Sequence, residues 1–165
     1  MANPSKQRGT AAETAVVRAA QTRGFPHSDR LTLSGARDRG DVRFTTGLTA
    51  GVVAEVKGGN MARTASDALV EKWLDEAELA KKHTGAAVSF LVVQRGGHGL
   101  PNAHRWHTYW RRAWVAELTG EVIRPSILGL LPVRMSLEHA LLFLREHGYG
   151  EPLTDEDFVG CREAS

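Results

Sequence analysis

Two short apolar runs on either side of a turn place the strongest constraint on the fold. They occupy residues 42–44 and 52–56, and the residues between them are rich in threonine and glycine. Short apolar runs bounded by such turn residues predict two antiparallel strands joined as a β-hairpin. Because side chains alternate across a strand, Glu55 and Lys57 are expected on one face of the second strand.

A further carboxylate, Asp41, precedes the first strand of this hairpin. With the turn centred between residues 46 and 51, antiparallel pairing places Asp41 opposite residues 55–57, and cross-strand neighbours have Cβ atoms about 4.5–5.5 Å apart. Two carboxylates and an ammonium would then converge, which suits a Mg²⁺ ion and a water that attacks a phosphodiester. The lysine could orient or deprotonate that water, or stabilise the transition state as a point charge. The residues alone equally fit an ordinary ion pair between Glu55 and Lys57 on the solvent face of a strand.

Asp41, followed after a hairpin turn by Glu55-Val56-Lys57, resembles the signature of metal-dependent nucleases that is written PD-(D/E)xK. Gly40 stands where the signature has proline, a departure that many members share. Motifs this short acquire meaning from the context in which they occur.

The wider pattern is similar to Holliday junction resolvases of the archaeal and phage type. In these proteins a glutamate on the first helix follows a basic segment, here Glu13 after residues 6–10. A Gly-Phe pair closes that helix, here Gly24-Phe25, and a Ser-Gly pair lies in the loop before the aspartate, here Ser34-Gly35. The resemblance covers residues 6–95.

This resemblance implies an α/β fold with a restriction-endonuclease-like core, in which helices flank a central mixed β-sheet. It implies a Mg²⁺-dependent endodeoxyribonuclease, with Mn²⁺ able to substitute. The metal ligands would be Asp41, Glu55, the carbonyl of Val56 and Glu13. Lys57 would position the attacking water, so the catalytic set is Glu13, Asp41, Glu55 and Lys57.

Within this class we expect a resolvase that makes paired cuts in four-way DNA junctions. Paired symmetric cuts require two sites related by a twofold axis, so a homodimer is expected. Two alternatives stay open. One is an exonuclease or flap-cutting repair nuclease of the same superfamily, and the other is a catalytically silent DNA-binding module.

Charge is distributed unevenly along the chain. Residues 1–45 hold eight basic and four acidic side chains, whereas residues 151–165 hold five acidic side chains and one basic. A basic half beside a phosphodiester-cleaving site fits a polyanionic substrate, although a solvated surface with a polar tail has the same composition. Glycines 58 and 59 would let a DNA backbone approach closely. The candidate DNA contacts are Lys6, Arg8, Arg30, Ser34, Arg37, Arg39 and Arg63.

The first predicted helix spans residues 7–23 and ends at Gly24, a residue favoured just beyond a helix C-terminus. Its apolar stripe includes Val16, Val17 and Ala20, and Glu13 lies in line with that stripe. A carboxylate on a core-facing stripe is unfavourable unless it is paired or metal-linked. Glu13 equally fits the edge of the stripe near the helix start, where the helix dipole stabilises it.

Further elements follow the same periodicity rules. A short strand is predicted at 31–33, a helix from 64 or 66 to about 83 ending at Gly85, and a fully buried strand at 86–93. The acidic residues at 75, 76 and 78 are interpreted as the solvated face of that helix. Residues 104–114 mix histidine, arginine and aromatic side chains, and three interpretations are open: a His-x-x-His zinc site, a DNA-contacting surface, or packing in the core or a dimer interface.

The 165 residues suffice for one domain. We expect a nuclease core at about 6–118, an extension at about 120–150 that enlarges the core or builds a partner surface, and a mobile acidic tail at 151–165. No apolar run approaches a membrane span, and residues 1–8 lack the apolar stretch of a secretory signal. Cys161 is the only cysteine, so no intrachain disulfide can form. A cytoplasmic location, in a bacterium or a phage-infected cell, is expected.

Overall fold

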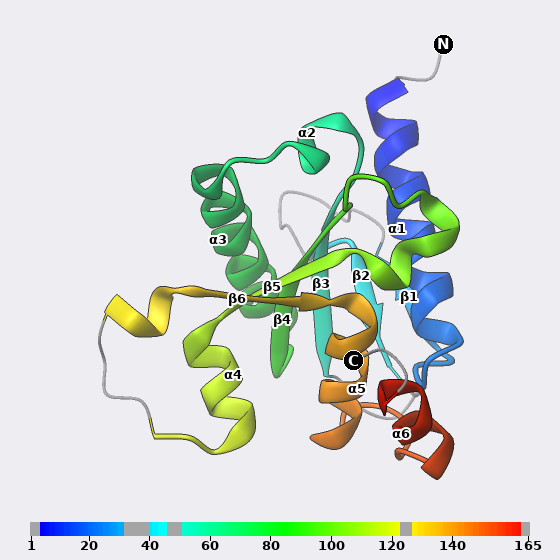
Figure 1. The fold of residues 1–165 in the computed structure, drawn as a ribbon. Helices are drawn as coiled ribbons and strands as arrows, with labels where there is room; N and C mark the ends of the chain where they lie inside the picture. Colours follow the sequence, from blue (N-terminus) through cyan, green and yellow to red (C-terminus); the bar gives the residue numbers. More distant parts are fainter. Residues whose placement is uncertain (1–3, 32–39, 46–50, 123–126, 163–165) are drawn as a thin grey trace.

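The computed structural model describes residues 4–31, 40–45, 51–122 and 127–162 (Figure 1). Within these ranges lies a six-stranded sheet whose strands are adjacent in chain order. β3 and β4 run parallel, and the other neighbouring pairs run antiparallel. The strands are β1 (Asp29–Arg30), β2 (Val42–Phe44), β3 (Val52–Lys57), β4 (Val88–Val93), β5 (His107–Arg111) and β6 (Pro132–Ser136).

Helices cover both faces of this sheet (Figure 1). One apolar core joins α1 and α5 to the face that carries Ala54 and Val56, and a second joins α3 to Leu91 and Val93. The predicted α/β fold with a mixed sheet between helices is therefore confirmed. The helices are α1 (Pro4–Gln21), α2 (Asn60–Arg63), α3 (Asp67–Thr84), α4 (Arg112–Thr119), α5 (Leu137–Glu146) and α6 (Asp155–Arg162), with 3-10 helices η1 (Leu100–Arg105) and η2 (Ile127–Leu130).

The parallel pair is connected through α3, whose two ends the sequence marks clearly. At the start, the Ser66 hydroxyl accepts the backbone N–H of Leu69 at 3.3 Å. At the end, Gly85 has a φ of 68°, a left-handed conformation that glycine adopts without the strain of a Cβ. All six residues of β4 are buried, as expected for a parallel strand covered on both faces. The predicted helix ending at Gly85 and the buried strand after it are confirmed.

The predicted hairpin is also confirmed, since β2 pairs antiparallel with β3 and places Val42 opposite Ala54. The turn at 46–50 lies outside the described residues. The short strand predicted at 31–33 is largely outside them as well. The structure instead shows β1 two residues earlier, followed by a hydrogen bond from the Leu31 N–H to the Asp41 carbonyl at 2.8 Å.

The aromatic segment at 104–114 packs inward. Trp106 and Trp110 are fully buried, and Trp110 stacks on Phe90 with ring centroids 4.6 Å apart. The packing interpretation is therefore confirmed for these tryptophans. In the described part of the chain no three histidine, cysteine, aspartate or glutamate side chains form a group that could hold a metal, so the zinc hypothesis has no ligand set there.

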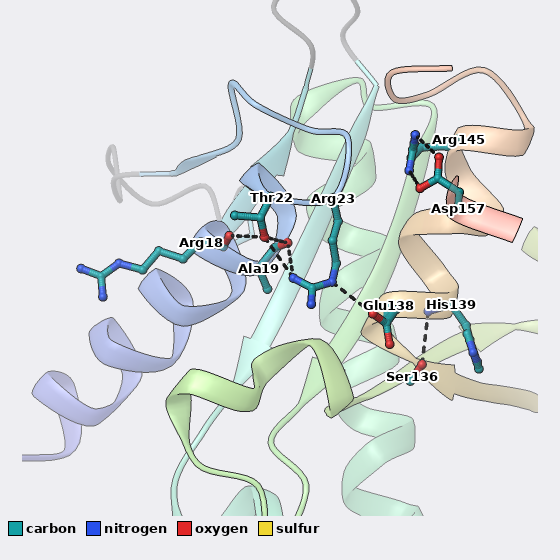
Figure 2. Close-up of polar contacts among 9 residues, drawn as sticks. All are labelled: Arg18, Ala19, Thr22, Arg23, Ser136, Glu138, His139, Arg145 and Asp157. Carbon is teal, nitrogen blue, oxygen red and sulfur yellow. Dashed lines mark hydrogen bonds and ion pairs between the residues drawn. The ribbon is translucent and has the colours of Figure 1, made fainter. Parts of the chain in front are cut away.

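Residues beyond 120 extend the core, because α5 buries Leu137, Leu141 and Leu144 completely. Arg145 then holds the acidic C-terminal segment. Its guanidinium contacts both carboxylate oxygens of Asp157, at 2.7 and 2.8 Å (Figure 2). The mobility predicted for residues 151–165 stays a prediction. Among the described helices, none combines the length and apolarity that crossing a membrane requires.

Candidate active site

Asp41 lies where the β2–β3 ladder ends, and its side chain continues the ladder. Its backbone N–H donates to the Ala54 carbonyl at 3.0 Å, and its Oδ2 accepts the N–H of Val56 at 2.7 Å. The carboxylate thus satisfies a strand donor beyond the last β2 pair. Because the N–H and C=O of one strand residue point to the same neighbouring strand, the Val56 carbonyl is directed to the edge on which Asp41 lies.

Glu55 and Lys57 project from the face of β3 that α3 covers, as side-chain alternation predicts. The Lys57 Nζ lies 2.6 Å from Glu55 Oε1 and 2.7 Å from Oε2 of Glu76 on α3. It also lies 5.8 Å from the ring centroid of Trp73. The ion pair between Glu55 and Lys57 is therefore confirmed, but its expected position on the solvent face of the strand is wrong, because Glu55 is only 5% exposed.

The protonation state of Lys57 follows from these neighbours. Burial by itself would lower the pKa of the ammonium, but the charges and hydrogen bonds of Glu55 and Glu76 outweigh it and raise the pKa above its usual value. Lys57 is therefore an ammonium at neutral pH and has no lone pair with which to accept a proton. Water orientation and charge stabilisation use the charged form of Lys57, whereas deprotonation of water would use the neutral amine, and all three roles stay predictions.

Glu76 is a site residue that sequence reasoning missed. The residues at 75, 76 and 78 were interpreted together as the solvated face of a helix, yet Glu76 reaches Lys57. The available signal was its position on the helix, three residues after the buried Trp73 and next to the buried Ala77. This position lies at the border of the apolar stripe, from which a long side chain reaches the sheet.

Gln94 was missed as well. It is 4% exposed, its Oε1 accepts the N–H of Gly59 at 2.8 Å, and its backbone N–H donates to the Lys57 carbonyl at 2.9 Å. It therefore clamps the turn that follows Lys57 to the end of β4. The signal in the sequence was a polar amide placed directly after a continuous apolar run, where an unpaired polar group is unfavourable.

The glycines after Lys57 serve the packing of the protein itself. A methyl group at Gly58 would come within 2.5 Å of the Ala12 Cβ, so α1 lies directly against this turn. The expectation that Gly58 leaves room for DNA is therefore corrected, because the space belongs to α1. Gly59 has a φ of 86° and needs glycine for its conformation.

Glu13 is engaged by Arg30. The Oε2 atom of Glu13 accepts a hydrogen bond from Nε of Arg30 at 2.7 Å and lies 2.6 Å from Nη2 of the same arginine. Arg30 pairs with Val42, whose side chain belongs to the α1 core, whereas Glu55 and Lys57 lie under α3. The structure brings Asp41, Glu55 and Lys57 to the end of β3, and the described contacts of Glu13 are on the other face. Roles for Glu13 in the site and for Arg30 in DNA binding stay predictions.

The remaining predicted DNA contacts divide into two groups. Ser34, Arg37 and Arg39 lie outside the described residues. Lys6, Arg8 and Arg63 are exposed, the first two on the opening turns of α1 and the third on α2.

The donor set at the end of β3 suits Mg²⁺ rather than a softer ion. Asp41, Glu55 and the Val56 carbonyl supply oxygen atoms alone, and Mg²⁺ needs one or two carboxylates because it retains water ligands. The described residues supply no third carboxylate to this group. Comparison with family models, with curated proteins and with solved structures found no match. What the chain does is therefore inferred from its own residues and their geometry.

Proposed function

We propose that this chain is a Mg²⁺-dependent endodeoxyribonuclease, and specifically a Holliday junction resolvase with a restriction-endonuclease-like core. The observation that carries the proposal is the arrangement at the end of β3. There the Asp41 carboxylate binds the Val56 N–H, and the buried Glu55 carboxylate binds the Lys57 ammonium. This is the spacing of the PD-(D/E)xK signature that the sequence resembles, displayed by adjacent strands of one hairpin.

The chemistry assigns separate roles to these groups. Asp41, Glu55 and the Val56 carbonyl would hold Mg²⁺, which when bound lowers the pKa of its water and neutralises charge on the phosphate. In this proposal Lys57 acts in its protonated form and would donate hydrogen bonds to the attacking water or to a phosphate oxygen. With Glu55 as a metal ligand, Glu76 would still bind the Lys57 ammonium, which it contacts at 2.7 Å. In this proposal Glu13 completes the site only after Arg30 has released it.

The substrate and assembly follow from the same proposal. The basic side chains on α1 and α2 would contact phosphates, and Mn²⁺ would replace Mg²⁺. Two symmetric cuts in a junction require a homodimer. The enzyme would act in the cytoplasm, where its DNA substrate resides.

A cleavage assay on a panel of substrates tests this proposal. A labelled four-way junction, a linear duplex, a flap and a single strand are each incubated with Mg²⁺ and the wild-type protein or Asp41→Asn. Paired symmetric nicks on the junction, absent with Asp41→Asn, are the expected result. Asp41-dependent cutting of flaps or ends would indicate that the protein is a repair nuclease and not a resolvase. No Asp41-dependent cutting of any substrate would leave the DNA-binding alternative.

A further inference from the structure

A groove runs between α1 and η1, on the side of α1 away from β1. Its volume is about 660 Å³, and its walls carry Arg18 and Arg23, with His104 and the hydroxyls of Thr14 and Thr22. None of the residues that line it is acidic. The groove is thus a concave surface with positive charge. Its lining does not include Asp41, Glu55 or Lys57 at the end of β3.

The two arginines differ in what already holds them (Figure 2). Arg23 donates to Thr22 Oγ1 at 3.0 Å and makes a long contact of 3.4 Å with Glu138. The guanidinium of Arg18 extends away from the helix, and in the described part of the chain no carboxylate pairs with it. A solvated guanidinium beside a groove is ready to accept an anion, because no existing ion pair has to be broken.

Exposed basic side chains recur along the length of α1. Glu13 is the one carboxylate of this helix, and Arg30 neutralises it. Lys6, Arg8 and Arg18 are all exposed along its length. Clustering of basic residues along one helix is the usual electrostatic footprint of a nucleic-acid backbone.

Distance along α1 connects the groove to the proposed site. The Arg8 side chain borders Gly59, two residues after Lys57, and Arg18 lies ten residues further along the helix. Ten residues correspond to about 15 Å, which is the axial rise of about four base pairs in a duplex that runs alongside the helix. We infer that the groove between α1 and η1 binds the sugar–phosphate backbone of a DNA arm about four nucleotides from the bond that is cut. This inference rests on the proposed function.

The test compares Arg18→Ala with Arg112→Ala, which removes the same charge from an exposed arginine on α4. Binding to a four-way junction is measured by fluorescence anisotropy in EDTA, so that no cleavage is needed. Arg18→Ala should bind several-fold more weakly, with a salt slope smaller by about 0.9, as for the loss of one phosphate contact. Arg112→Ala should bind like the wild type.

A second arm of the experiment separates contact from structure. Junctions are prepared with one uncharged methylphosphonate at each successive position of an arm. The wild type should lose affinity at about the fourth step from the cut, and Arg18→Ala should be insensitive at that position alone. Equal binding by the two variants, or an unchanged methylphosphonate profile in Arg18→Ala, would overturn the inference and leave the proposed function standing. No binding of any DNA by the wild type would overturn both.

Discussion

Replacing Gly58 by alanine should push α1 away from the end of β3. The new methyl group would lie 2.5 Å from the Ala12 Cβ, whereas ordinary contacts begin near 3.4 Å, so about 1 Å of movement is required. Overpacking of this kind destabilises by about 1–3 kcal/mol. Alanine also reduces the conformational entropy of the unfolded chain, which offsets about 0.4–1 kcal/mol of this destabilisation. We expect a net loss of about 1–2 kcal/mol in the free energy of unfolding.

A second substitution makes this expectation specific. Ala12→Gly alone should destabilise by about 1 kcal/mol through lost helix propensity, and by somewhat more through the lost methyl contact. In the double variant the methyl group of residue 58 takes the space that residue 12 gives up. The double variant should therefore be more stable than the sum of the single effects predicts, by about 1–2 kcal/mol.

Urea unfolding followed by tryptophan fluorescence measures these differences. Gly96→Ala is the matched control, because a methyl group there meets no atom within 4 Å in the described structure. The reasoning is refuted if Gly58→Ala is as stable as Gly96→Ala. It is also refuted if the effects of Gly58→Ala and Ala12→Gly are simply additive, since additivity means that the two residues do not touch.

Three further predictions concern buried polar groups. Gln94→Leu should lower the free energy of unfolding by about 1–3 kcal/mol, because the Gly59 N–H loses its acceptor. Gln94→Glu should be more stable than Gln94→Leu, because a carboxylate oxygen can still accept that N–H. Glu76→Gln should lower the pKa of Lys57, measured by NMR of the lysine Cε, because one of the two carboxylates that raise it loses its charge. Hydrogen bonds from Arg145 hold the pKa of Asp157 at about 2, so stability should be lost as pH falls from about 4 through 2, and urea midpoints at pH 5 and 2.5 should differ less in Asp157→Asn.

Each of these has a control and a contrary result. Equal stability of Gln94→Leu and Gln94→Glu would show that the amide does not hold the turn. Glu78→Gln, on the same helix as Glu76, should leave the Lys57 pKa unchanged, and an equal shift in both variants would contradict the contact. The same loss of stability at low pH in Asp157→Asn and the wild type would assign that loss to other carboxylates.

Local pattern was sufficient for the elements that position the site. The hairpin followed from two short apolar runs on either side of Thr- and Gly-rich residues, and α3 and β4 followed from a capping serine, a terminal Gly85 and a continuous apolar run. Alternation alone placed Glu55 and Lys57 on one face. Antiparallel register then brought Asp41 to Val56. These inferences need no knowledge of distant contacts.

Contacts between distant elements could not be predicted in this way. Glu76 resembles its neighbours at 75 and 78 in sequence, and only the packing of α3 on β3 selects it as the partner of Lys57. The pairing of Glu13 with Arg30 depends on how α1 crosses β1. Gly58 could not be interpreted from the sequence for the same reason. A glycine beside a site allows close approach either by a ligand or by another part of the protein, and in the structure it is α1 that approaches Gly58.

The central claim is tested most directly by single-turnover cleavage of a four-way junction with Mg²⁺, comparing Glu55→Gln with Glu78→Gln. Both variants replace a glutamate by its amide, one at the end of β3 and one on α3, where Glu78 pairs with Lys82. The proposal predicts that Glu55→Gln loses at least about a hundredfold in rate while still binding the junction, and that Glu78→Gln cuts like the wild type. Cleavage by Glu55→Gln at the wild-type rate would contradict the assignment of the active site.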